Sequence, residues 1–154
     1  MPSRQPRNPE PCPVARSVEL IGDRWSLLIV RDAFDGMRRF SDFQRSLGVA
    51  RNILADRLRK LVEAGILETE AAAEGSAYQA YVLTPRGQSL FPLVLALRQW
   101  GETHLFAPDE AHSQLLDRRT GLRGSDGRAI LDRDVVHGAA RRLDAARVDR
   151  SVEC

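Results

Sequence analysis

Apolar residues recur at steps of three and four along roughly the first hundred residues, which is the spacing of amphipathic helices. A short helix is predicted over residues 14–21, where Gly22 ends it. Asp23 can cap a second, largely buried helix, which continues until Asp35 and Gly36 break it. The N-terminal part of the chain is therefore predicted to form two consecutive helices.

Two further helices are predicted to be joined by a tight connection of about three residues. Phe40, Phe43 and Leu47 mark a short helix that Gly48 ends, and a longer amphipathic helix covers residues 50–64 until Gly65 stops it. The apolar positions of the longer helix share one face, and its polar positions share the opposite face. The inward positions are Leu54, Leu58, Leu61 and Val62, and the outward positions are Asn52, Ala55, Asp56, Arg59 and Glu63.

Short β-compatible runs over residues 66–70 and 78–83 flank a stretch of alanine, glutamate, glycine and serine over residues 71–77, which predicts a hairpin. Thr84 and Pro85 then make a favourable helix start. One long helix is predicted over residues 85–106, with a kink or a lost backbone hydrogen bond at Pro92. The apolar stripe of this helix is wider than one small domain needs.

This order of elements predicts a mainly α fold with a small β-hairpin wing, the winged helix-turn-helix. Residues 12–107 are expected to form the winged domain, preceded by a flexible arm over residues 1–11. After Pro108 the sequence changes to glycine, aspartate and arginine, and an extra hairpin or helix is expected in an extension of unknown role over residues 108–154.

The composition fits one soluble domain and offers no catalytic constellation. The chain has 154 residues, of which 43% are hydrophobic and 29% charged. No apolar run approaches the roughly 20 residues of a membrane span, so a cytoplasmic protein without membrane contact is expected. The cysteines and histidines lack metal-ligand spacing, and the common nucleotide-binding and hydrolase motifs are absent. We expect neither an enzyme nor a metal or cofactor.

Positive charge is concentrated between residues 38 and 60, where seven basic residues stand against two acids, while the whole chain carries only +2. Such a block is typical of a surface that meets phosphates, although it is also compatible with a solvated helix face. In a helix-turn-helix the second helix enters the DNA major groove, which places Arg51 and Asn52 at base edges. The expected DNA-contacting residues are Arg38, Arg39, Ser41, Arg45, Ala50, Arg51, Asn52, Ala55, Asp56 and Arg59.

Several motifs, in the same order, resemble the HxlR-type transcriptional regulators, relatives of the MarR group, over about two-thirds of the chain. They are Cys12-Pro13, Glu19-Leu20-Ile21-Gly22-Asp23-Arg24-Trp25, Arg38-Arg39-Phe40-Ser41-Asp42-Phe43, Arg57-Leu58-Arg59-Lys60-Leu61, Glu63-Ala64-Gly65-Ile66-Leu67, Leu83-Thr84-Pro85-Arg86-Gly87 and Trp100-Gly101.

The resemblance implies a homodimer on an inverted-repeat operator, with the N-terminal segment and the long helix of the domain 12–107 as its dimerisation helices. This would explain the surplus apolar face of the long helix. Alternatively, that face only covers the winged domain. The dimer interface candidates are Val14, Val18, Leu90, Leu93, Val94, Leu97 and Trp100. Family wings commonly carry a basic residue near the tip, whereas here Glu70 and Glu74 are acidic, so minor-groove contact by the wing is not expected.

Cys12 matches the family's N-terminal cysteine, which in several members senses oxidants or electrophiles. The first turn of a helix and the nearby Arg16 would favour a thiolate there. Alternatively, Cys12 only packs near the dimer seam, and the effector is a small molecule or there is none. The sequence thus predicts a DNA-binding regulator, a repressor rather than an activator. The alternative function is a winged-helix protein-interaction module without specific DNA binding.

Overall fold

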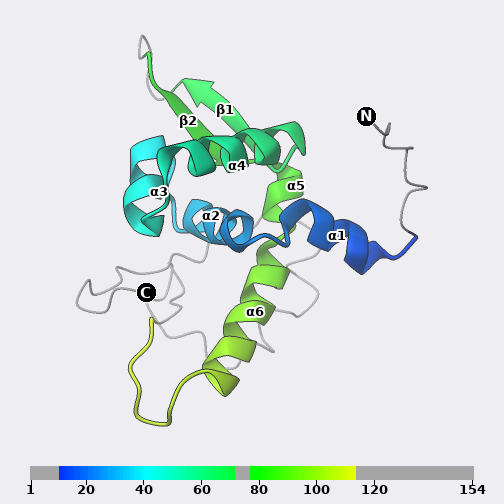
Figure 1. Cartoon of the computed structure of the whole chain (residues 1–154), viewed down its shortest axis with the longest axis vertical. Helices are drawn as coiled ribbons and strands as arrows, with labels where there is room; N and C mark the ends of the chain where they lie inside the picture. The colour runs from blue at the N-terminus through cyan, green and yellow to red at the C-terminus, as the bar shows by residue number, and fades with distance from the viewer. Residues whose placement is uncertain (1–10, 72–76, 114–154) are drawn as a thin grey trace, which may run out of the picture.

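The computed structural model describes residues 11–71 and 77–113 of the chain, and Figure 1 shows their arrangement. Helices and strands follow one another in the predicted order of a winged helix-turn-helix. The helices are α1 (Pro13–Ile21), α2 (Arg24–Phe34), α3 (Phe40–Leu47), α4 (Arg51–Glu63), α5 (Pro85–Gln88) and α6 (Phe91–His104), and the strands are β1 (Leu67–Ala71) and β2 (Gln79–Leu83). The predicted fold class is confirmed.

Local chemistry sets the helix boundaries where the sequence predicted them. The Asp23 carboxylate accepts hydrogen bonds from the backbone N–H groups of Trp25 (2.9 Å) and Ser26 (3.0 Å), which caps α2. Gly48 and Gly65 end α3 and follow α4 with φ of 60° and 68°, a left-handed conformation that glycine adopts without strain. The turn between α3 and α4 is therefore short and sharply defined.

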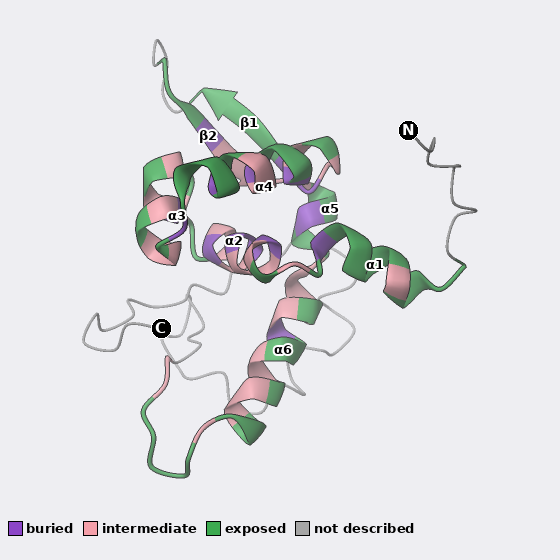
Figure 2. Cartoon of the chain, viewed as in Figure 1, coloured by how far each residue is buried: buried purple, intermediate pink, exposed green. Residues whose placement is uncertain are grey.

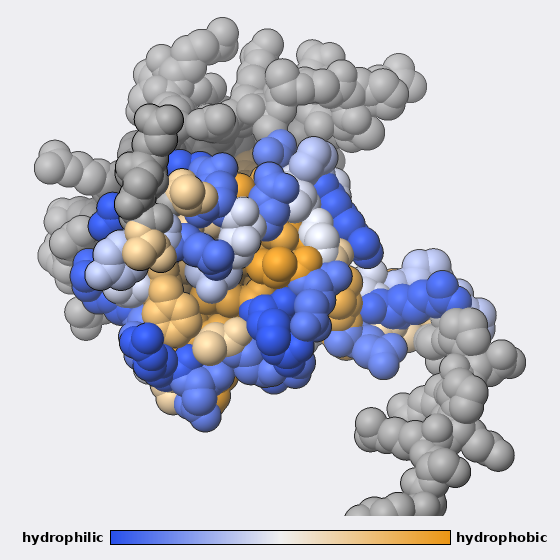
Figure 3. Space-filling view, turned by 90° about the horizontal axis from the view of Figure 1, so that it is seen from above, coloured by the Kyte–Doolittle hydropathy of each residue, from blue (hydrophilic) through white to orange (hydrophobic). Residues whose placement is uncertain are grey.

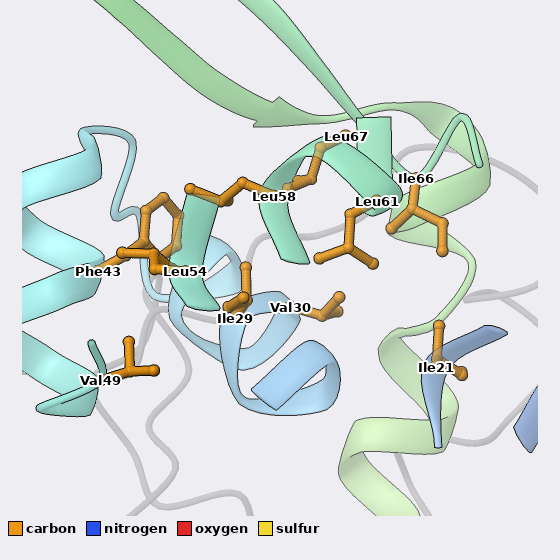
Figure 4. Packing of buried hydrophobic residues seen from close by; sticks show 10 residues of the cluster. All are labelled: Ile21, Ile29, Val30, Phe43, Val49, Leu54, Leu58, Leu61, Ile66 and Leu67. Atoms are coloured by element: carbon orange, nitrogen blue, oxygen red, sulfur yellow. The ribbon is translucent and has the colours of Figure 1, made fainter. Parts of the chain in front are cut away.

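The core lies where α2, α3, α4 and the base of the hairpin meet, as Figures 2 and 4 show. Leu54, Leu58 and Leu61 of α4 are at most 1% exposed and point towards Ile29 and Val30 of α2. The inward face predicted for this helix is confirmed, with Val62 only partly buried. Burial of one face fixes the rotation of α4 about its axis and leaves the opposite face in solvent.

The hairpin is antiparallel, with Leu67 opposite Leu83 and Glu70 opposite Ala80. The Thr84 hydroxyl donates to the carbonyl of Gly65 and accepts a bond from the N–H of Gly87 at 3.0 Å, which joins the end of α4 to the start of α5. A Cβ atom at Gly87 would lie 2.1 Å from the Ile66 carbonyl oxygen, so this close approach requires glycine. The base of the wing is thus fixed to the helical core.

The single long helix predicted over residues 85–106 is wrong, because the chain forms two helices that are separated at Ser89 and Leu90. Proline has no N–H to give to the carbonyl four residues earlier, and its ring clashes with that carbonyl inside a helix. Pro92 is accommodated in the first turn of α6, where no such bond is required. α6 therefore leaves the winged core in a new direction (Figure 1).

Two predictions lie outside the described residues. One is the arm over residues 1–11, of which only Pro11 is described, and the other is the hairpin or helix after Pro108, where the description ends at residue 113. Among the helices that the structure does describe, none combines the length and apolar character needed to span a membrane.

Candidate nucleic-acid interface

The helix-turn-helix consists of α3, the connection 48–50 and α4. Its second helix, α4, lies across α2 and presents its outer face to solvent (Figures 1 and 2). Ala50, Arg51 and Asn52 at the start of α4 are all exposed. Seen from above, on the side of α4 and the hairpin, mostly hydrophilic residues surround a smaller hydrophobic area (Figure 3). The N-terminal turn of α4 is therefore accessible to a large partner.

Arg51 is held in place by an aromatic ring rather than by an acid. Its guanidinium carbon lies 5.1 Å from the centroid of the Phe40 ring, a cation–π contact between the first residues of α4 and α3. Phe40 in turn packs against the hydrophobic core. Arg39, the N-cap residue of α3, is exposed beside them. The starts of the two helices thus bring two guanidinium groups to one region of the surface.

The backbone adds to this positive region. Ala50 caps α4 without a side-chain hydrogen bond, and the first bond inside the helix runs from the Leu54 N–H to the Ala50 carbonyl. The N–H groups of the first turn therefore receive no side-chain cap and carry the positive end of the helix dipole. The arrangement can accept an anion such as a phosphate oxygen.

The C-terminal half of α4 has a different environment, because its basic side chains are paired with acids of the same helix. Arg59 contacts Asp56 at 2.8 Å and Glu63 at 2.6 Å, and Lys60 contacts Asp56 at 2.9 Å. The hydrogen bonds from Lys60 and Arg59 lower the pKa of Asp56, and those to Asp56 and Glu63 raise the pKa of Arg59. Asp56 and Arg59, two of the predicted DNA contacts, are thus engaged with each other.

Arg57 points back towards the start of α2. Its Nε lies 3.6 Å from Asp23, and both side chains are at most 30% exposed. Partial burial acts to raise the pKa of Asp23. The hydrogen bonds from Ser26 and Trp25 and the charge of Arg57 outweigh this effect, so the pKa of Asp23 is lowered. Arg57 therefore joins α4 to α2 instead of extending to solvent.

Two further basic residues have acidic neighbours. Arg38 contacts Glu70 of β1 at 2.6 Å, and Arg45 lies 3.8 Å from Asp42 of the same helix, with its side chain 79% exposed. Of the seven basic residues counted between residues 38 and 60, only Arg39 and Arg51 have no carboxylate partner within the described ranges 11–71 and 77–113.

The sequence window overstated the available charge because three of the pairing acids lie outside it: Asp23, Glu63 and Glu70. The Arg59–Glu63 pair follows from i, i+4 spacing and was open to detection. The pairs of Asp23 with Arg57 and of Glu70 with Arg38 join elements far apart in the chain, and no local pattern marks them. The support of Arg51 by Phe40 was missed for the same reason.

A family model described as HxlR-like helix-turn-helix matches residues 20–109. The chain belongs to this family. Its match covers the helix-turn-helix, the two strands of the wing and α6, and ends before residue 113, after which the structure describes no residue. The expected family is confirmed, and the positions expected to contact DNA remain predictions.

Among the relatives of this HxlR-like chain, the HTH-type transcriptional regulator Rv3095 of Mycobacterium tuberculosis is 43% identical over 96 residues, which are 62% of this chain and 61% of the relative. The chain thus matches about three-fifths of the length of that mycobacterial relative. The regulator YybR of Bacillus subtilis is 33% identical over 63% of this chain and 78% of its own.

Two solved structures share the fold. PA1607 has 55% sequence identity and a TM-score of 0.70, covering 75% of this chain and 80% of that chain. The redox regulator HypR in its reduced form has 30% identity and a TM-score of 0.57, covering 61% of this chain and 94% of that chain. Both similarities support the arrangement of helices and wing described above.

The predicted dimer residues of this HxlR-like protein fall into two groups. Val14 and Val18 of α1 are 69% and 58% exposed, and Leu93, Leu97 and Trp100 of α6 are 41%, 48% and 57% exposed. The other two candidates, Leu90 and Val94, pack against the winged core. The exposed group lies on the two helices at the margins of the core, where it leaves apolar surface uncovered in the single chain (Figure 2).

Cys12, the predicted redox-sensing residue, is exposed and occupies the N-cap position of α1, where its carbonyl accepts a bond from the Arg16 N–H at 3.1 Å. It is two residues from Val14, so it lies beside the exposed apolar part of α1. The second cysteine, Cys154, lies outside the described residues.

Proposed function

We propose that this protein is a sequence-specific DNA-binding transcriptional regulator. The observation that carries the proposal is the exposed N-terminal turn of α4, where Arg51 is supported by Phe40 and has no carboxylate partner among the described residues. A helix with its side chains is about 10–12 Å across and fits the major groove of B-DNA. The HTH-type regulator names of the relatives support this proposal.

Each residue of the proposed interface has a chemical role. The fork of donors on Arg51 suits the O6 and N7 acceptors of guanine, and the amide of Asn52 suits the donor and acceptor of adenine. Arg39 beside them and the exposed Arg45 suit phosphate oxygens, which position the protein without specifying sequence. Ser41 of α3, the N-cap residue Ala50 and Ala55 of α4 are also exposed and line the remaining approach.

We further propose that the active form is a homodimer on an inverted repeat. The exposed apolar residues of α1 and α6 would be covered if the same patch on two copies met across a two-fold axis. Two recognition helices related by that axis would then contact two half-sites about one helical turn of DNA apart. We propose a repressor, because a dimer across an operator blocks access by other proteins.

Regulation through Cys12 completes the proposal. An exposed thiol at a helix N-cap, beside the exposed apolar surface of α1, is placed to alter that surface when an oxidant or electrophile modifies it. The fold shared with the redox regulator HypR supports this role. The effector we propose is thus an oxidant or an electrophilic small molecule, and the protein acts in the cytoplasm.

The test is selection of bound duplexes from a random pool by the purified full chain, once reduced and once after mild thiol oxidation, with Cys12→Ser as the control. The proposal predicts an enriched inverted repeat for the reduced wild type and for both states of the variant. Enrichment that oxidation does not change would overturn only the role of Cys12. Absence of any enriched motif would overturn the regulator and favour the protein-interaction module, with α1 and α6 as its apolar contact surface.

A further inference from the structure

An ion pair joins the wing to the connection between α2 and α3. The Arg38 Nη2 atom lies 2.6 Å from the Glu70 Oε1 atom, although the two residues are 32 positions apart in the chain. Glu70 sits on β1, and the Arg38 carbonyl accepts a hydrogen bond of 2.7 Å from the N–H of Tyr81 on β2. Arg38 is therefore held by its backbone to one strand and by its side chain to the other.

The path of the Arg38 side chain follows from the register of the hairpin. Thr69 is opposite Tyr81 and Glu70 is opposite Ala80, so the side chain must pass over β2 to reach β1. Ala80, the cross-strand neighbour of Glu70, is only 4% exposed, and its small methyl group leaves room for this crossing. The guanidinium is thereby directed to the carboxylate.

The pair is unsuited to a purely structural role. The Arg38 side chain is 57% exposed and the Glu70 side chain 48%, and ion pairs at such exposure add little to stability. A guanidinium fork binds a phosphate in the same way as it binds a carboxylate. Arg38 directly precedes Arg39, the N-cap residue of α3, so it borders the surface that we propose binds DNA.

We propose that Glu70 is a built-in competitor of DNA phosphate for Arg38. In the wild type the carboxylate keeps the guanidinium occupied when DNA binds, so Arg38 neutralises no phosphate unless the Glu70 charge is removed. The wing thus lowers the affinity for DNA and makes that affinity less dependent on salt. A wing with basic residues would instead add contacts to DNA. This inference rests on the proposed DNA-binding function, and Glu70 is a positioning residue that acts through Arg38.

The test compares Glu70→Gln with Glu68→Gln. Glu68 is exposed on the same strand and has no ion pair with any described residue, so its variant removes an equal charge without releasing Arg38. Binding of the full chain to a labelled duplex is measured by fluorescence anisotropy over a series of salt concentrations. One duplex carries the enriched repeat, and a second of the same length is scrambled, because phosphate contacts do not depend on sequence.

For Glu70→Gln we expect the slope of log affinity against log salt to steepen by about 0.9 on both duplexes, the value for one extra neutralised phosphate. The gain in affinity should therefore be about threefold larger at about 50 mM salt than at about 200 mM. Glu68→Gln should change the slope by less than half as much. In an Arg38→Ala background, Glu70→Gln should leave the slope unchanged.

Any one of three results would overturn the inference. The two glutamine variants could show equal slopes, the effect of Glu70→Gln could persist without Arg38, or Glu70→Gln could bind DNA more weakly than the wild type. Thermal unfolding of each variant checks that the fold is intact. If the wild type does not prefer the enriched duplex, sequence-specific regulation fails while the slopes on the scrambled duplex still decide the role of Glu70. If it binds neither duplex, both proposals fail.

Discussion

The two ends of α4 carry similar residues in opposite environments. At its N-terminal turn, Arg51 rests on the Phe40 ring and has no carboxylate neighbour among the described residues. At its C-terminal half, Arg59 and Lys60 are both within 3.0 Å of Asp56. The difference shows that a count of basic residues along a helix is a poor measure of the charge that the helix offers to a partner.

Spacing along the helix explains the contrast. Asp56 precedes Arg59 by three positions and Lys60 by four, and Arg59 precedes Glu63 by four, so the four side chains are neighbours on the helix surface. The first turn of α4 contains no acid. The positive end of the helix dipole and an arginine without an acidic partner therefore coincide at one end only, and we place the contact with bases at that end.

The largest expected effect separates the buried face of α4 from its exposed turn. Leu58 is fully buried, and Leu58→Ala should lower the free energy of unfolding by about 2–5 kcal/mol because it leaves a cavity between α4 and α2. Arg51→Ala should change the same quantity by at most about 1 kcal/mol, because it removes only an exposed cation–π contact with Phe40. Urea unfolding of both variants provides the measurement, and comparable losses would contradict the assignment of Arg51 to binding.

The second effect concerns DNA. Arg51→Ala should weaken binding to the enriched duplex by about 1–3 kcal/mol, because it removes a proposed contact to a guanine edge. Arg59→Ala is the matched control on the same helix and should change the dissociation constant by less than about twofold, since Asp56 and Glu63 already hold that side chain. Anisotropy titrations at one fixed salt concentration would show a reversed order if the C-terminal half makes the contact.

A smaller effect is expected at Asp23, which draws Arg57 away from the exposed face of α4. Asp23→Ala removes the cap of α2 and should cost about 0.5–2 kcal/mol of stability, whereas Asp23→Asn can retain the cap and loses only the charge. Unfolding measured for both variants separates the two contributions. Equal stability of the alanine variant and the wild type would show that the cap contributes nothing.

The lowered pKa of Asp23 sets the pH dependence of this contribution. The folded state favours the carboxylate, so the stabilisation from its charge is present above the unfolded pKa of about 3.9 and is lost as pH falls through the lower folded pKa. The difference in stability between wild type and Asp23→Asn should therefore shrink as acid is added below about pH 4. A difference that grows in acid would contradict the direction of the shift.

The smallest effect is expected from Asp56→Asn, which would make the two ends of α4 more alike. It frees Lys60, while Arg59 keeps its contact with Glu63. The freed charge lies away from the proposed base contacts and is screened by salt, so the dissociation constant should fall by less than about twofold at physiological ionic strength. A larger tightening in the same titration would mean that Lys60 reaches phosphate.

Periodicity in the sequence was sufficient to predict α2, α3 and α4 because each of these helices buries one face against the same core. It failed at residues 85–106, where the apolar pattern continues through Pro92 but one continuous helix cannot, because proline lacks the N–H that the helical hydrogen bond requires. The chain forms two helices there, α5 and α6. The exposure of Arg51 did not follow from this periodicity, because Arg51 precedes Leu54 by three positions and Leu58 by seven and so lies close to the inward stripe. Its exposure depends on its position as the first residue of α4, at the edge of the core.

The pairing of charges was predictable only where it is local. The acids within α4 could be assigned from their spacing, whereas Asp23 and Glu70 reach their arginines through tertiary folding. Two of the seven apolar dimer candidates, Leu90 and Val94, pack against the winged core at and after the break between α5 and α6. Facing directions after such a break depend on packing that the sequence pattern does not record.

The measurement that tests the central claim most directly is a parallel selection of duplexes by the wild type, Arg51→Ala and Arg59→Ala from one random pool. We predict that the wild type and Arg59→Ala enrich the same inverted repeat, while Arg51→Ala loses its preference at one position in each half-site. If Arg51→Ala retains the full preference while Arg59→Ala loses it, the N-terminal turn of α4 is not where this protein recognises bases.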